Sequence, residues 1–155
     1  MAANNGSPQI ERLAKARTNF AKLAVKAVMQ VAIDLNAKIA DRVQNEGKNA
    51  EGEDFGTYAT MTQEYKKKKG HDLAPFPQVN FTDTGQMFNS IRPEIKKQSN
   101  SEIVVEISAH GAFNKFKMDK NVDRFGTIIE ASPDELKEAF EDVGIAIGRE
   151  VDRNL

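Results

Sequence analysis

The chain contains no cysteine and no tryptophan, and it has only two tyrosines and two histidines. Without cysteine, disulfide bonds and thiolate catalysis are excluded, which fits a protein made in a reducing cytoplasm. The shortage of Trp and Tyr leaves few large anchors for a binding groove. His71 and His110 lie in no metal-ligand spacing, so we expect neither a metal site nor a cofactor.

Long apolar segments are also missing. No run approaches the roughly 18 residues of a membrane span, so we expect no membrane contact. Residues 1–8 are small and polar and predict a flexible N-terminus without a signal peptide. The 155 residues, of which 39% are apolar and 29% charged, predict one soluble domain over 9–155 that is large enough to bury a core.

The N-terminal region predicts one long helix over 9–46. Ser7 and Pro8 supply an N-cap and a proline in the first turn, and Gly47 follows the last turn. At about 1.5 Å per residue this helix exceeds about 50 Å, so part of it is expected to project toward a neighbouring subunit, unless it is kinked or broken and buries its apolar residues locally. Met29 and Ile33 lie outside the main apolar stripe and are candidates for that contact. The stripe comprises Ile10, Leu13, Phe20, Ala24, Ala27, Val28, Val31, Leu35 and Ile39.

The middle of the chain predicts short elements. Thr60 to Gln63 resembles a capping box that opens a helix ending at Gly70, and Pro93 is expected to stop a second short helix. The expected order is a loop at 47–57, a helix at 60–69, an extended segment at 71–79, a helix at 82–91, a hairpin of strands at 94–98 and 101–109, a covering loop or edge strand at 110–125, and a short strand at 127–129.

A second long helix ends the chain. Ser132, Pro133 and Glu135 form a capping box with a proline in the first turn. Its apolar stripe comprises Leu136, Phe140, Val143, Ile147 and Val151, with Gly144 and Gly148 beside it, where another backbone could approach closely. The sequence therefore predicts an α+β fold: a long N-terminal helix and a C-terminal helix packed on a small antiparallel sheet.

Charge is distributed unevenly along the chain. Residues 1–50 contain eight Lys/Arg and four Asp/Glu, whereas residues 130–155 contain three and eight. The two ends should attract each other, within one protomer or between neighbours, unless they are simply helices with different solvent faces. A positive face of Lys15, Lys22 and Lys26 would then meet acids such as Glu141 and Asp142.

Two charged segments are candidates for phosphate binding or for acid–base chemistry. Lys66 to Lys69 could contact phosphates with Tyr65 nearby, or they form a solvated helix end that opposes the helix dipole. A third possibility is that they contact the acidic C-terminal segment of a neighbouring subunit. The acidic pairs, such as Glu51 with Glu53, lie in hydrophilic stretches without an apolar pocket. No phosphate-binding loop or nucleophile elbow is present, so we expect no catalytic residue and no enzymatic activity.

Several short motifs resemble a family of tailed-bacteriophage virion proteins, the neck or tail-completion group, which overlaps with the virion-morphogenesis group. They are GTYA at 56–59, YKKKKG at 65–70, FTDTGQMFNSI at 81–91, and the segment from DRFG at 123–126 to SPDEL at 132–136. The third is similar to the pattern L-T-x-T/S-G-x-M/L-x-x-S-I/L that precedes a hairpin in that family. The resemblance covers about two thirds of the chain, although Phe125 stands where the family usually has proline after the arginine.

The resemblance implies a structural subunit of the virion that is assembled in the host cytoplasm and forms a six- or twelve-fold ring in the neck. Its partners would be copies of itself, a portal-side adaptor or connector, and tail-tube or terminator proteins, with DNA passing through the lumen without specific binding. Interface residues are then expected at Met29, Ile33 and the segment 110–124, which includes Phe113, Phe116 and Arg124. The alternative is a small nucleic-acid-binding protein that uses Lys66 to Lys69 and the first-helix lysines.

Overall fold

A long helix forms the axis of the molecule. The computed structural model describes residues 8–70, 79, 81, 86–99 and 102–154, and it has the predicted α+β fold. Its elements are α1 (Pro8–Asp41), the π-turn η1 (Arg42–Glu46), α2 (Thr60–Lys69), α3 (Gln86–Asn89), β1 (Ile91–Gln98), β2 (Ile103–Ala109), α4 (Ala112–Phe125) and α5 (Pro133–Asn154). The predicted extended segment at 71–79 lies, apart from Val79, outside the described residues, as does the N-cap Ser7.

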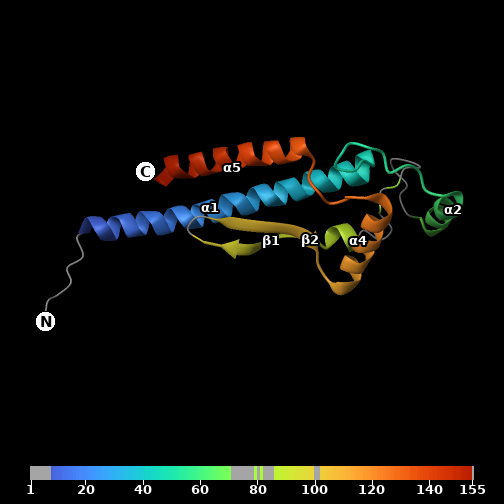
Figure 1. Ribbon diagram of the computed structural model, residues 1–155, viewed down its shortest axis with the longest axis horizontal. Coiled ribbons are helices and arrows are strands. Elements are labelled where there is room, and N and C mark those ends of the chain that lie inside the picture. Colours follow the sequence, from blue (N-terminus) through green and yellow to red (C-terminus); the bar gives the residue numbers. More distant parts are fainter. Residues whose placement is uncertain (1–7, 71–78, 80, 82–85, 100–101, 155) are drawn as a thin grey trace.

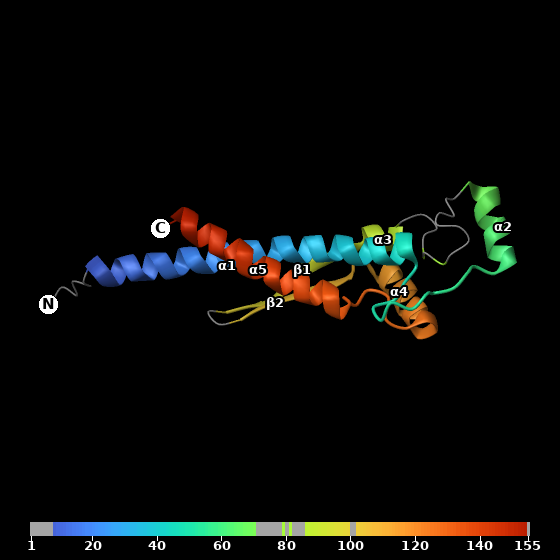
Figure 2. The same cartoon turned by 90° about the horizontal axis from the view of Figure 1, so that it is seen from above.

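The helix α1 lies between α5 on one side and the β1–β2 hairpin on the other (Figure 1). The helix α5 runs antiparallel to it, and α1 continues past the C-terminal end of α5 (Figures 1 and 2). At its own C-terminal end, α1 widens into the π-helical turn η1 and stops at Gly47, whose φ of 66° is left-handed. The predicted length of the helix and its end near Gly47 are thus confirmed.

The hairpin confirms the predicted strand pair. The two strands are antiparallel, with Ile91 opposite Ala109, and their register shifts between Ile95 and Lys97. Pro93 was expected to stop a helix, but it lies inside β1 opposite Ile107, and α3 ends earlier, at Asn89. In a two-stranded sheet every strand has a free edge, where the missing N–H of proline costs no ladder hydrogen bond.

The hydrophobic core lies at the C-terminal end of α1. Its buried residues come from α1, η1, α3, β1, α4 and the loop before α5, and they are Ile39, Val43, Met87, Phe88, Ile91, Met118 and Ile128. Ile128 is completely buried, but it belongs to no strand, so the predicted strand at 127–129 is wrong. An irregular segment can bury one apolar side chain without the period-2 alternation of a half-buried strand.

The segment 110–125 was expected to be a loop or an edge strand, and this prediction is wrong, because most of it forms α4. The inward face of α4 alternates Met118 with Asn114 and Asn121, which interrupts the apolar period by which a helix is recognised. Each asparagine amide has a hydrogen-bond partner, since Asn114 donates to the carbonyl of His110 at 3.2 Å. Asn121 donates to the sulfur of Met87 at 3.5 Å.

The two predicted capping boxes have different outcomes. At α5 the box is confirmed: the backbone N–H of Ser132 donates to Oε2 of Glu135 at 2.6 Å, and the N–H of Glu135 donates to Oγ of Ser132 at 3.2 Å. At α2 it is wrong, because Ala59 occupies the N-cap without a side-chain hydrogen bond. Gln63 donates instead to the carbonyl of Tyr58 at 2.6 Å.

Gly126, which ends α4, has φ 76° and ψ −158°, a conformation open essentially to glycine alone. We expect Gly126→Ala to lower the free energy of unfolding by about 1–3 kcal/mol because of backbone strain. The matched control is Gly144→Ala in α5, where an added Cβ meets nothing within 4 Å and should stabilise the monomer by up to about 1 kcal/mol. Urea unfolding would measure both, and equal effects of the two substitutions would contradict the prediction.

Candidate assembly surfaces

The predicted interface residues lie on three separate surfaces. The surface on α1 has four exposed residues, Lys15, Lys22, Lys26 and Ile33, and the half-buried Met29. The surface on α4 has the exposed Phe113 and Phe116. The surface on α5 has the exposed Glu141 and the half-buried Asp142. Arg124 lies in α4, but its side chain is outside the described part of the chain. No single surface of one protomer therefore contains all the predicted residues.

An apolar groove runs between α1, β2 and α5. It has a volume of about 180 Å³ and is lined by Val28, Val31, Ala32 and Leu35 of α1, Val105 and Ile107 of β2, and Leu136, Ala139, Phe140 and Val143 of α5. The Phe140 side chain is 74% exposed and that of Leu136 41%. Burial of apolar area is worth roughly 25 cal/mol per Å², so covering these side chains would stabilise a complex.

The apolar stripe predicted for α5 is consequently only partly covered. Val143 and Ile147 are half-buried, while Ile145, outside the stripe, is 51% exposed. Gly144 and Gly148 were expected where another backbone could approach closely, but within the protomer an added Cβ at either glycine meets no atom within 4 Å. The outer face of α5 thus combines the exposed Ile145 side chain with two glycines that have open space beside them.

A second groove lies between the N-terminal half of α1 and the tip of the hairpin. It has a volume of about 320 Å³ and is lined by Arg17, Phe20, Ala21, Ala24, Val25, Val28, Gln98, Ser99, Glu102 and Ile103. Phe20 is 49% exposed, although its position in the stripe of α1 predicts a core residue. The molecule therefore has a closed core at one end and incompletely covered apolar faces along α1 and α5.

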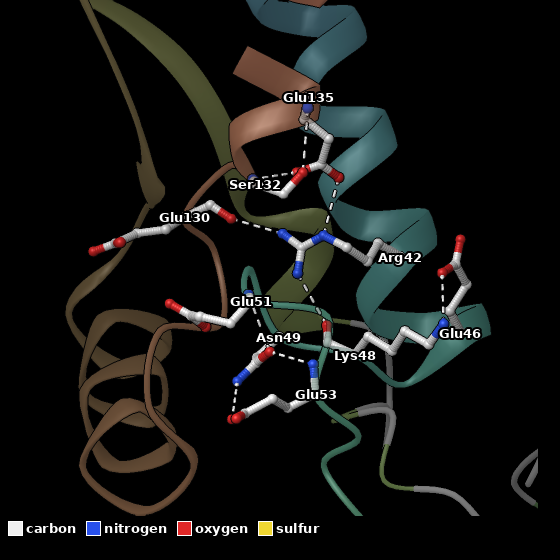
Figure 3. Close-up of polar contacts among 9 residues, drawn as sticks. All are labelled: Arg42, Glu46, Lys48, Asn49, Glu51, Glu53, Glu130, Ser132 and Glu135. Carbon is white, nitrogen blue, oxygen red and sulfur yellow. Dashed lines mark hydrogen bonds and ion pairs between the residues drawn. The ribbon is translucent and has the colours of Figure 1, made fainter. Parts of the chain in front are cut away.

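A buried arginine joins the two long helices (Figure 3). The Arg42 guanidinium donates from Nε to Oε1 of Glu135 at 3.0 Å and to the backbone carbonyls of Lys48 at 3.0 Å and Glu130 at 2.6 Å. Glu135 is also the capping residue of α5, so one carboxylate serves both the cap and the ion pair. This contact fixes the start of α5 against the end of α1.

The predicted attraction between the basic and acidic ends of the chain is confirmed within the protomer. Besides the Arg42–Glu135 pair, Nζ of Lys38 lies 2.7 Å from Oε1 of Glu138. The hydrogen bond with Glu138 raises the pKa of Lys38 above its ordinary value. Arg42 was not among the predicted contact residues, although it is a charged residue beside the apolar row that continues from Leu35 and Ile39 to Val43.

The lysine run of α2 does not form one basic surface. Lys66 is buried, and its Nζ lies 3.2 Å from the Tyr58 hydroxyl and 4.2 Å from the centroid of the Tyr58 ring. Lys67, Lys68 and Lys69 are exposed. A cavity of about 380 Å³ adjoins Lys66 and Tyr58, with Tyr65 and Phe81 among the residues of its wall.

The described residues contain no group of three or more His, Asp or Glu side chains placed to hold a metal ion. The carboxylates of Glu51 and Glu53 are exposed, and both residues instead belong to a loop organised by Asn49 (Figure 3). The Asn49 side-chain oxygen accepts the backbone N–H groups of Glu51 and Glu53 at 3.1 and 2.8 Å. His71 is outside the described residues, and Nδ1 of His110 lies 3.3 Å from Arg92.

Comparison with known proteins identified no relative of this chain. No protein-family model, curated protein or solved structure matches the chain. Among the helices described, none has the length and hydropathy of a membrane span.

Proposed function

We propose that this chain is a structural subunit of the virion of a tailed bacteriophage, forming a ring in the neck that connects head and tail. The observation that carries the proposal is the apolar groove between α1, β2 and α5, with Phe140 exposed at its mouth. Exposed aromatic side chains such as Phe140 are enriched at protein–protein interfaces. The motif resemblance at 56–59, 65–70, 81–91 and 123–136 supplies the class of assembly.

The shape of the molecule supports an assembly role. Most core residues lie at the C-terminal end of α1, whereas the described side chains at 15–20 are all exposed. A helix that extends past its own domain offers a contact surface distinct from the groove (Figure 1). Two different surfaces on one subunit permit head-to-tail contacts, and such contacts close into rings when the rotation between copies allows it.

Nucleic-acid binding is the competing function. It would use the lysines of α1 and α2, but α2 and the N-terminal end of α1 lie at opposite ends of the molecule (Figure 1). Lys66 is only 4% exposed, which removes one of the four cations of the run from contact with phosphates. The basic groups of α2 and of the N-terminal end of α1 are thus divided between two distant sites, and within the described residues these two helices form no continuous basic groove.

The proposal is tested by mixing the purified chain with tail-less portal–adaptor complexes and, separately, with duplex DNA at two salt concentrations. We expect stable association with the complexes, seen by co-sedimentation and electron microscopy, and no salt-dependent DNA affinity. DNA binding with a steep salt dependence and no association with the complexes would favour the nucleic-acid-binding function instead.

A substitution in the groove sharpens the test. We expect Phe140→Ser to weaken assembly at least tenfold, because about 1.4 kcal/mol corresponds to a factor of ten and a buried Phe contributes more than that. The free energy of unfolding should hardly change, since the side chain is already 74% exposed. The matched control is Met61→Ser on α2, where the side chain is 82% exposed and far from the groove. Equal assembly by both variants would contradict the assignment of the groove.

A further inference from the structure

We infer that the basic N-terminal part of α1 in one copy docks on the acidic outer face of α5 in the next copy. This inference rests on the proposed ring and names the contact that builds it. The occupant of the exposed α5 face is thus a second copy of this chain, which contributes residues from Pro8 to Lys26.

The projecting end of α1 is strongly basic. Between Pro8 and Lys26 the sequence has five Lys/Arg and one Glu, a surplus of four positive charges. Every side chain described from Lys15 to Phe20 is exposed, including the apolar Ala16 and Phe20. This part of α1 has cations in several directions and an incompletely covered aromatic ring between them, which suits an acidic and partly apolar partner.

The outer face of α5 is complementary in charge. Between Pro133 and Asn154 the sequence has seven Asp/Glu and three Lys/Arg, a surplus of four negative charges. Asp134, Glu138, Glu141 and Asp152 are exposed, and Ile145 is exposed among them, while Phe140 lines the groove beside this face. Because Gly144 and Gly148 have no atom within 4 Å of an added Cβ, a partner helix can approach this face closely. Complementary potentials of this kind fix the register and orientation of an interface.

The two surfaces cannot meet within one protomer. Glu135 pairs with Arg42 and Glu138 with Lys38, so the start of α5 is held against the C-terminal end of its own α1. The antiparallel α5 then ends before the first turns of α1 are reached (Figures 1 and 2). Because the surfaces differ and lie apart, the contact between copies can be head-to-tail, and it closes into a ring when the rotation between copies allows it.

The absence of cysteine allows a direct cross-linking test. Ala16→Cys and Gly144→Cys replace exposed small residues on the two surfaces. We expect the double variant to form an oxidised ladder of covalent oligomers larger than a dimer. The matched control combines Gly144→Cys with Lys68→Cys on α2 and should give no ladder. A ladder that stops at the dimer, or none in a chain that still assembles, would overturn the head-to-tail contact.

Charge reversal tests the same contact independently. We expect Lys15→Glu/Lys22→Glu and, separately, Glu141→Lys/Asp152→Lys each to weaken assembly at least tenfold. An equimolar mixture of the two variants should assemble again, because each reversed surface then meets its complement. Lys68→Glu/Lys69→Glu is the control with the same charge change and should assemble normally.

The outcomes separate the contact from the function. If the unaltered chain assembles and the reversed variants assemble equally well, the α1–α5 contact is wrong while the proposed neck function stands. If the unaltered chain assembles neither alone nor with portal–adaptor complexes, the proposed function fails and the contact fails with it.

Discussion

Arg42→Met should lower the free energy of unfolding by about 3–5 kcal/mol, since it leaves a buried carboxylate without its counter-ion. The side chains of Arg42 and Glu135 are only 10% and 13% exposed. The substitution also leaves the carbonyls of Lys48 and Glu130 without the guanidinium donor. Urea unfolding of the monomer, followed by circular dichroism, measures the change.

Two further variants isolate the buried charge as the cause. Adding Glu135→Gln to Arg42→Met should recover part of the loss, because a neutral amide costs less to bury than an unpaired carboxylate. Lys38→Met is the matched control: it removes a cation from the same helix, but the pair with Glu138 is exposed and worth less than about 1 kcal/mol. If Arg42→Met were no more destabilising than Lys38→Met, the Arg42–Glu135 ion pair would not be the contact that stabilises the packing of α5 on α1.

Ile128→Ala should cost about 2–5 kcal/mol, the range for deleting a buried aliphatic side chain and leaving a cavity. The Ile128 side chain has an exposed fraction of 0%, in a core with Val43, Phe88 and Met118. Its irregular backbone segment is closed by Gly126 on one side and Ser132 on the other, so we expect limited collapse around the cavity. The shift in the urea midpoint measures the loss.

Ile33→Ala is the control for Ile128→Ala, because it makes the same chemical change at a residue that is 48% exposed. Surface substitutions usually stay within about 0.5 kcal/mol, and alanine favours the helix slightly. Similar effects at the two positions would mean that the loop before α5 is not part of the core.

The sequence predicted the elements whose local signals agree with their tertiary roles. The capping box of Ser132 and Glu135 appears with both reciprocal hydrogen bonds, and β2 alternates half-buried Val105 with exposed Val104 and Glu106. In these elements, local chemistry and burial select the same structure. The sequence did not predict α4, because hydrogen-bonded asparagines occupy part of its inward face and two phenylalanines its outward face.

The candidate surfaces were predicted less completely than the fold. Sequence periodicity shows which side of a helix is apolar, but not how much of that side another element covers. Phe140 illustrates the limit, since its place in the stripe of α5 predicts burial and its ring is 74% exposed. Lys66 is the reverse case: a member of a lysine run is 4% exposed because Tyr58 lies against its ammonium group.

The proposed head-to-tail assembly depends on where burial and charge lie in this molecule. The core and the Arg42–Glu135 ion pair hold one end of α1. The basic side chains at its other end and the acidic side chains on the outer face of α5 are exposed. Contacts between such surfaces are weakened by salt, because the Debye length falls from about 10 Å at 0.1 M to about 3 Å at 1 M. Assembly should therefore be tighter at low ionic strength.

The most direct test of the proposed neck subunit is its mass in solution, measured by light scattering after size exclusion at low and high salt, alone and with portal–adaptor complexes. We predict a ring-sized species that shrinks as salt rises, or a monomer that joins a ring when the complexes are added. A monomer that ignores the complexes at both salt concentrations would contradict the proposed function.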